Sequence, residues 1–210
     1  MNYHYLFRII ILGHPGVGKT SLMHALTGQP ISMFHEPTIG IDFATTLTPL
    51  VQGELIKTHL WDTAGQEYFS PIVQAYYRNV AGAIFVFAVN NRDSFYRLHY
   101  WINELKRVNK TPGRLLLVAN KIDLHPRIVR KSEGEKFAHD HGMEYVEISV
   151  KNKDNTPLFF YDFLQDIYDS IDPNAPSLPP GIKKPAAITP DIMVSLPPKP
   201  MPPTDCCVLL

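Results

Sequence analysis

The sequence predicts an α/β fold: a doubly wound, mostly parallel sheet of six strands, with one antiparallel edge strand and helices on both faces. Short, solidly apolar runs alternate along the chain with segments whose apolar residues recur at helical spacing. Solid apolar runs are typical of parallel strands that are buried on both faces. Two other runs follow each other closely and predict a hairpin, which supplies the antiparallel edge strand.

The first half of the domain is expected to contain one strand, one helix and this hairpin. Tyr5–Leu12 is rich in isoleucine and stops at a glycine, which predicts a buried strand. Gly18–Thr27 has leucine and alanine at helical spacing and predicts a helix. Ile41–Leu50 alternates in part between apolar and polar residues, and the turn Val51–Glu54 separates it from Leu55–Trp61.

The second half of the domain alternates strands and helices more regularly. The continuous apolar runs and the periodic segments follow one another, which is the order expected for a parallel sheet with crossover helices. The expected strands are Ala83–Val89, Leu115–Ala119 and Tyr145–Ser149, and the expected helices are Asp93–Val108, Lys131–His141 and Thr156–Ile171.

Composition limits the classes of function. Lysine plus arginine and aspartate plus glutamate both number 20, so the formal net charge is zero. This balance excludes a strongly basic nucleic-acid-binding protein, and we expect no nucleic-acid partner. The chain has only two cysteines, Cys206 and Cys207, which are adjacent and cannot form a disulfide framework.

Proline marks the division of the chain into parts. Of the 19 prolines, 11 lie between Pro173 and Pro203. Such a stretch lacks the apolar volume for a core and the N–H donors for a sheet. We therefore expect a folded domain over residues 1–172, a proline-rich flexible tether over residues 173–205, and a short terminal segment over residues 206–210 that contains both cysteines.

A phosphate-binding loop is the strongest motif. The stretch from Gly13 to Thr20 satisfies G-x-x-x-x-G-K-[ST] and lies between a predicted strand and a predicted helix. In such a loop the backbone N–H groups and the helix dipole point at phosphates. Lys19 would reach the β- and γ-phosphates, and the Thr20 hydroxyl would ligate Mg²⁺. The expected phosphate-contacting residues are Gly13, His14, Pro15, Gly16, Val17, Gly18, Lys19, Thr20 and Ser21.

Two later motifs complete a nucleotide site. Asp62 ends a buried strand and suits a Mg²⁺ site, Gly65 allows close approach to a γ-phosphate, and Gln66 could orient a water. Asp123, in the sequence Asn120-Lys121-Ile122-Asp123, can accept both the ring N–H and the exocyclic amine of guanine, which adenine does not offer together. A last segment after a strand could supply a backbone N–H to the guanine carbonyl, and its residues are Ser149, Val150 and Lys151.

With these motifs in order, residues 1–172 resemble the Ras-like small GTPases, and the Rab family in particular. The stretches that carry the Rab resemblance are Ile39–Phe43, Leu60–Glu67, Tyr76–Gly82 and Asn91–Phe95. The resemblance implies the phosphate-loop NTPase fold of small G proteins, with GTP and GDP as ligands and Mg²⁺ as cofactor. It also implies slow GTP hydrolysis with Gln66 and Lys19 as catalytic residues.

The resemblance assigns further roles. Thr38 would be the switch threonine, which holds Mg²⁺ together with Thr20 and Asp62 and releases when the γ-phosphate is lost. Phe43, Trp61 and Tyr76 would form the surface that effectors read. The implied partners are effectors, an exchange factor, a GTPase-activating protein, a prenyltransferase and a prenyl-binding chaperone.

Two alternatives stay open beside a hydrolysing switch. Pro15 and Ile31 depart from the family pattern, and they support a GTP-bound interaction module that does not hydrolyse. An ATP-dependent kinase is disfavoured because Asp123 suits guanine.

The end of the chain predicts a lipid anchor. Cys207-Val208-Leu209-Leu210 matches C-a-a-X with leucine at X, the geranylgeranyl type, and Cys206 is expected to carry a second lipid. We therefore expect the protein on the cytoplasmic face of an intracellular or plasma membrane, with a soluble chaperone-bound pool.

Overall fold

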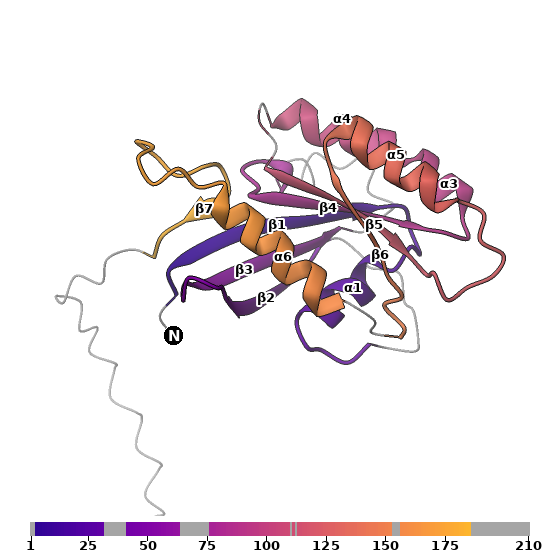
Figure 1. Ribbon diagram of the computed structural model, residues 1–210, viewed down its shortest axis with the longest axis horizontal. Coiled ribbons are helices and arrows are strands. Elements are labelled where there is room, and N and C mark those ends of the chain that lie inside the picture. Colours follow the sequence, from indigo (N-terminus) through magenta and orange to yellow (C-terminus); the bar gives the residue numbers. More distant parts are fainter. Residues whose placement is uncertain are drawn as a thin grey trace, which may run out of the picture.

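A computed structural model describes residues 3–31, 41–63, 76–109, 111, 113–152 and 156–185. Figure 1 shows a central twisted sheet with helices on both faces. The strands are β1 (Tyr5–Gly13), β2 (Ile41–Pro49), β3 (Leu55–Thr63), β4 (Gly82–Ala88), β5 (Arg114–Asn120), β6 (Glu144–Glu147) and β7 (Ile182–Lys183). The helices are α1 (Lys19–Leu26), α3 (Arg92–Tyr96), α4 (Leu98–Val108), α5 (Lys131–His141) and α6 (Thr156–Asp169).

The sheet has the topology of a doubly wound α/β fold, which confirms the predicted fold class. The strand order is β2-β3-β1-β4-β5-β6, with parallel pairing from β3 through β6. The hairpin partner β2 pairs antiparallel with β3 and forms the predicted antiparallel edge. The order reverses direction at β1, so the loop that follows β1 lies at the switch point where such sheets bind ligands.

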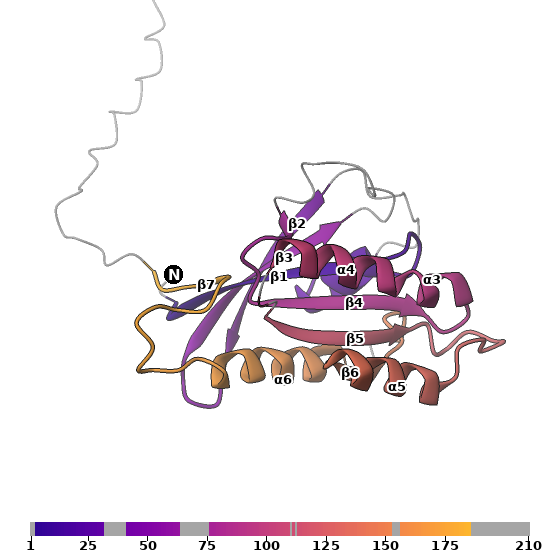
Figure 2. The ribbon, with the colours of Figure 1, turned by 90° about the horizontal axis from the view of Figure 1, so that it is seen from above.

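Two core clusters cover the two faces of the sheet. Strand β1 alternates between them: Ile9 and Ile11 face the cluster that includes the buried residues of α1 and α6, and Ile10 and Leu12 face the cluster with α3, α4 and α5. Figure 1 shows α3, α4 and α5 on one side of the sheet and α1 and α6 on the other, and Figure 2 shows α3 and α4 in front of the strands. A strand that is buried on both faces of the sheet needs apolar residues at every position, which explains the solid run from Ile9 to Leu12.

The predicted helix Asp93–Val108 is two helices in the structure. Arg97 separates α3 from α4 with φ −71° and ψ −9°, and the Tyr100 N–H donates to the Arg97 carbonyl at 3.1 Å. This i to i+3 bond is the tighter 3₁₀ pattern, which local periodicity does not distinguish from an α-helix. The other elements end within three residues of the prediction.

A seventh strand corrects the predicted start of the tether. Strand β7 pairs antiparallel with β1 beside Leu6 and Phe7, at the end of β1 where β4 does not reach. Ile182 is buried in the core, and the Arg8 N–H donates to the Gly181 carbonyl at 2.9 Å. Gly181 has φ +80°, and a Cβ there would lie 2.1 Å from the Ala81 nitrogen, so only glycine fits. Residues 173–185 therefore belong to the domain. The proline-rich composition of this segment does not reveal that one of its residues, Ile182, is buried in the core.

Candidate functional site

The loop after β1 is shaped by three glycines, Gly13, Gly16 and Gly18. A Cβ on Gly13 would lie 2.2 Å from the Val86 carbonyl oxygen of β4, so the loop starts pressed against the sheet. Gly16 and Gly18 have φ of +73° and +98°, the left-handed region that favours glycine. Left-handed residues within a turn aim successive backbone N–H groups into one concavity, which is an anion-binding arrangement. Gly18 caps α1, so this concavity lies at the helix N-terminus.

Lys19, Thr20 and Asp62 come together beside this loop. Lys19 is buried, and its ammonium group donates to the His14 carbonyl at 3.2 Å. The Thr20 hydroxyl donates to Asp62 Oδ2 at 2.5 Å, which joins α1 to the end of β3. Ser21 follows on α1 and is half-buried. The structure thus places the predicted phosphate lysine and two of the three predicted Mg²⁺ ligands in one place.

The Asp62 carboxylate fits a cation. Its side chain is fully buried, and its Oδ1 atom has no hydrogen-bond partner among the described residues. Burial raises the pKa of Asp62, whereas the Thr20 hydrogen bond and the Lys19 charge act to lower it. An orphaned carboxylate oxygen beside a hydroxyl is the oxygen-only donor set that Mg²⁺ takes, so Thr20 and Asp62 could hold this ion. No cluster of three or more potential metal-binding side chains occurs in the described part of the chain.

Asn120 connects the phosphate loop to the base side of the site. The Asn120 side chain is buried at the end of β5; its amide nitrogen donates to the Val17 carbonyl at 2.8 Å. Its Oδ1 atom accepts the N–H groups of Lys121 at 2.7 Å and Val150 at 3.2 Å. The Val150 N–H, one of the backbone donors of the segment expected to reach the guanine carbonyl, is therefore bonded to Asn120. A Cβ on Gly18 would lie 2.5 Å from the Asn120 amide nitrogen, so this packing also requires a glycine.

Lys121, Asp123 and Ser149 complete the base side. The Lys121 ammonium donates to the Gly16 carbonyl at 2.6 Å, and burial lowers the pKa of Lys121. The Ser149 hydroxyl donates to Asp123 Oδ1 at 2.6 Å, which fixes the carboxylate at the end of β5. Each carboxylate oxygen can accept more than one hydrogen bond, so Asp123 can still receive two donors from a base edge. Lys151 follows Val150 and is exposed.

Several predicted site residues lie outside the described residues. These are Thr38, Gly65, Gln66 and the two cysteines, Cys206 and Cys207. Ile31 is described, and it packs against the core cluster on the α1 and α6 face of the sheet.

The three predicted effector-contact aromatics form one continuous group. The Phe43 and Trp61 ring centroids are 4.7 Å apart, and those of Trp61 and Tyr76 are 4.9 Å apart. Phe43 is 44% exposed, although large aromatic residues are usually buried. Strands β2 and β3 pair Phe43 directly with Trp61, so the hairpin register places the two rings together.

Arg8 supports this aromatic group, and sequence reasoning missed that role. Its guanidinium carbon lies 5.1 Å from the Trp61 ring centroid and 5.9 Å from that of Tyr76. The Arg8 Nη2 atom donates to the Tyr76 carbonyl at 3.4 Å. Burial lowers the pKa of Arg8. The available signal was a lone arginine inside an apolar strand, because a half-buried cation requires a partner such as an aromatic ring.

The fold and this site define a phosphate-loop nucleotide-binding protein: a glycine loop at a sheet switch point, a buried lysine, a hydroxyl–carboxylate pair and a base-side carboxylate. A family model of the Ras family matches residues 8–169, which includes every described residue of this site. The chain therefore belongs to the Ras family of small GTPases, which bind GTP, GDP and Mg²⁺ and act as switches with regulators and effectors. Within the described residues, no helix has the length and apolar character to span a bilayer.

Proposed function

We propose that the protein is a Rab-type switch, which hydrolyses GTP slowly and recruits effectors to a membrane in vesicle trafficking. The observation that supports this most is the position of Trp61 next to Asp62 on β3. Successive strand residues face opposite sides, so the buried Asp62 meets Thr20 while Trp61 meets Phe43 and Tyr76. The phosphate side of the site and the aromatic group thus share one strand end, where a change at the γ-phosphate would reach effectors.

Different described residues would contact the phosphates, the guanine base and the metal ion of a GTP switch. Lys19 neutralises phosphate charge, the loop N–H groups orient the phosphates, and Asp123 selects guanine through two hydrogen bonds. Thr20 and Asp62 would hold Mg²⁺, which would supply positive charge to offset that of the phosphate oxygens. Gln66 would orient the attacking water. No lysine or arginine occurs between Lys19 and Lys57, so the first switch offers no arginine in cis, and a GTPase-activating protein would supply one.

Single-turnover GTP hydrolysis by the full chain tests the enzymatic part. We expect an intrinsic rate on the order of 10⁻⁴–10⁻³ s⁻¹ or below, because an arginine in trans typically contributes 10³–10⁵-fold. Gln66→Leu should remove most of this rate and keep GTP binding. Turnover faster than about one per second would contradict the slow-switch mechanism.

The same assay decides the alternative of a GTP-bound module that does not hydrolyse. The specific observation in its favour is Pro15, which removes one N–H donor from the phosphate loop. Hydrolysis that is undetectable in the parent chain and unchanged in Gln66→Leu would favour that alternative. A measurable rate that depends on Gln66 favours the switch.

Effector recognition is tested by affinity capture with GTP-loaded and GDP-loaded protein. Phe43→Ala should reduce GTP-dependent capture, because it removes an exposed ring from the aromatic group. Tyr96→Ala is a matched control, since Tyr96 is a 62% exposed aromatic residue on α3 outside this group. Equal loss in both variants would argue against the aromatic group as the effector surface.

Membrane anchoring would use lipids on Cys206 and Cys207, added by a prenyltransferase and carried by a prenyl-binding chaperone. One lipid gives only marginal anchoring, so two are proposed. Fractionation of the parent chain, each Cys→Ser variant and the double variant tests this. The double variant should be soluble and still bind nucleotide. If the double variant still pellets with membranes, the anchor lies elsewhere.

A further inference from the structure

One face of the sheet gathers basic side chains near the start of β1. The strand register places Arg8 of β1 opposite His59 of β3, and it places Leu6 opposite both Lys57 of β3 and Lys183 of β7. Residues that pair directly across a sheet point to the same side, and so do residues two apart on one strand. These five side chains therefore share one face. We call Arg8, Lys57 and Lys183 the cationic face.

The helices leave this part of the sheet uncovered. Phe7 and Ile9 of β1 belong to the core cluster with α1 and α6, so Arg8 points to the opposite face. On that face, the cluster with α3, α4 and α5 includes Ile10 and Leu12 but no earlier residue of β1 among those described. The start of β1 and the neighbouring part of β3 thus lie beyond the described helices on this side.

The charges on this face have one sign. No aspartate or glutamate occupies the corresponding positions of the four strands, because Asp42 and Asp62 pair with each other in register and lie on the opposite face. Within the part of the chain that the structure describes, Arg8, Lys57 and Lys183 form no ion pair with a carboxylate. The chain as a whole has no net charge, so this is a local excess.

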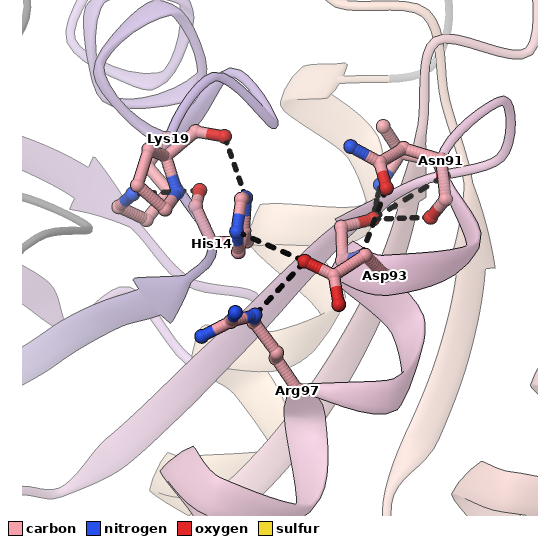
Figure 3. Close-up of polar contacts among 8 residues, drawn as sticks. His14, Lys19, Asn91, Asp93 and Arg97 are labelled. Carbon is pink, nitrogen blue, oxygen red and sulfur yellow. Dashed lines mark hydrogen bonds and ion pairs between the residues drawn. The ribbon is translucent and has the colours of Figure 1, made fainter.

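Cations elsewhere in the domain do have carboxylate partners. Figure 3 shows one example: Arg97 Nε donates to Asp93 Oδ2 at 2.9 Å, and His14 Nε2 lies 3.3 Å from the same oxygen. Three more arginines are paired with glutamates, namely Arg92, Arg107 and Arg127. The cationic face therefore differs from these pairs by offering positive charge that a binding partner can use.

The three cations lie close enough to act together. Burial first, and then the positive charges of Lys57, Arg8 and Lys183, lower the pKa of the His59 imidazole, which lies among them. Lys57 and Lys183 lie on either side of β1, and two strand spacings of about 4.8 Å separate their backbones by about 10 Å. Like charges at this spacing repel each other, and an anionic group bound over them would offset that repulsion.

The cationic face is continuous with the aromatic group. The Arg8 guanidinium carbon lies 5.1 Å from the Trp61 ring centroid, and the Phe43 ring centroid lies 4.9 Å from that of His59. Leu47 of β2 shares this face and is 37% exposed. Apolar side chains and cations thus form one surface, which suits a partner that carries both apolar side chains and carboxylates.

We propose that the cationic face and the aromatic group together dock an effector segment whose apolar side chains are flanked by aspartate or glutamate. The inference rests on the proposed function, because it names the chemistry of the partner that the aromatic group would bind. The rings would bury the apolar side chains, and the cations would meet the carboxylates. Such complementarity acts mainly on specificity and association rate. Three cations are fewer than the about four to eight of clusters that bind anionic membranes, which favours a protein partner.

Selection from a peptide display library tests the proposal, with the full chain loaded with a non-hydrolysable GTP analogue as bait. Peptides enriched on the parent chain should carry aspartate and glutamate beside apolar residues. Fluorescence polarisation then gives their affinity. In Lys57→Glu/Lys183→Glu their dissociation constant should rise by about tenfold or more, because attraction becomes repulsion at two positions. Added salt should weaken binding to the parent chain.

The double variant Lys106→Glu/Lys136→Glu is the matched control. It makes the same change in net charge at exposed positions of α4 and α5. It should bind the selected peptides like the parent chain. Both double variants should keep the parent affinity for GDP, which shows that their nucleotide-binding domain is folded.

The proposal is overturned if the enriched peptides have no excess of acidic residues, or if acidic peptides bind Lys57→Glu/Lys183→Glu as tightly as the parent chain. It is also overturned if this variant loses only binding to vesicles of phosphatidylserine and phosphatidylcholine, which would assign the face to a membrane. If acidic peptides lose affinity as expected but bind the GDP-loaded and GTP-loaded chain equally, the docking surface stands and the switch role in the proposed function fails.

Discussion

Replacement of Asn120 by alanine tests how strongly the site depends on one buried amide. The side chain makes three hydrogen bonds, to the Val17 carbonyl and to the N–H groups of Lys121 and Val150. Val17 and Val150 are almost completely buried, so water cannot easily replace the lost partner at either residue. Each buried group left unsatisfied costs about 1–1.5 kcal/mol at the low end of the usual range, which gives about 2–3 kcal/mol for two.

Nucleotide affinity should fall in Asn120→Ala, because the lost bonds hold the phosphate loop against the base side. A cost of about 2–3 kcal/mol corresponds to a dissociation constant raised by about 30- to 150-fold. Equilibrium titration with a fluorescent GDP analogue measures this change. Urea unfolding of the same protein measures the loss of stability.

Asn109→Ala is the matched control for this experiment. Asn109 is also buried and makes three hydrogen bonds, with the Tyr77 carbonyl, the Leu105 carbonyl and the Asn79 N–H. It follows α4 and bonds to residues just before β4 begins, whereas the phosphate loop follows the opposite end of the parallel strands, after Gly13. It should lose similar stability and keep its nucleotide affinity. Equal losses of affinity in the two variants would refute the assignment of Asn120 to the site.

Three further outcomes are expected. Asp123→Asn should weaken GTP binding and shift preference toward xanthine nucleotides, measured by competition; unchanged GTP affinity would contradict the base-site assignment. Burial and the neighbouring Asp166 raise the pKa of Glu144 to about 7, so the folded state holds a proton that the unfolded state releases. Stability should therefore fall by about 1 kcal/mol or less as pH rises from 4.5 to 7, and Glu144→Gln should abolish this slope in urea unfolding. Gly181→Val should destabilise the domain by about 1–3 kcal/mol, because a Cβ there clashes with Ala81; an unchanged urea midpoint would contradict the tight packing.

Much of the fold could be predicted because its signals are local. The buried strands β1 and β4 need apolar residues at successive positions, and that requirement appears directly as apolar runs. The phosphate loop could be predicted because glycine is required wherever φ is positive or a backbone approaches closely, as at Gly13 and Gly18. These constraints act within a few residues and leave a mark in the sequence.

The contacts that could not be predicted join distant segments. His14 meets Asp93, and Arg8 meets Trp61 and Tyr76, only after β1, β3 and α3 have been assembled around the sheet. Strand β7 depends on a gap beside β1, which exists because β4 begins opposite Ile9. No periodicity in the sequence carries such information, since each depends on where another element ends.

Strand β7 determines where on the domain an attachment through the following residues would act. It pairs with Leu6 and Phe7, whereas the phosphate loop begins at Gly13. Phe7 and Gly13 are six positions apart on the strand, a distance of about 20 Å at about 3.3 Å per residue. A sensor chip or bead linked to the chain after β7 would therefore pull on the end of β1 opposite the phosphate loop.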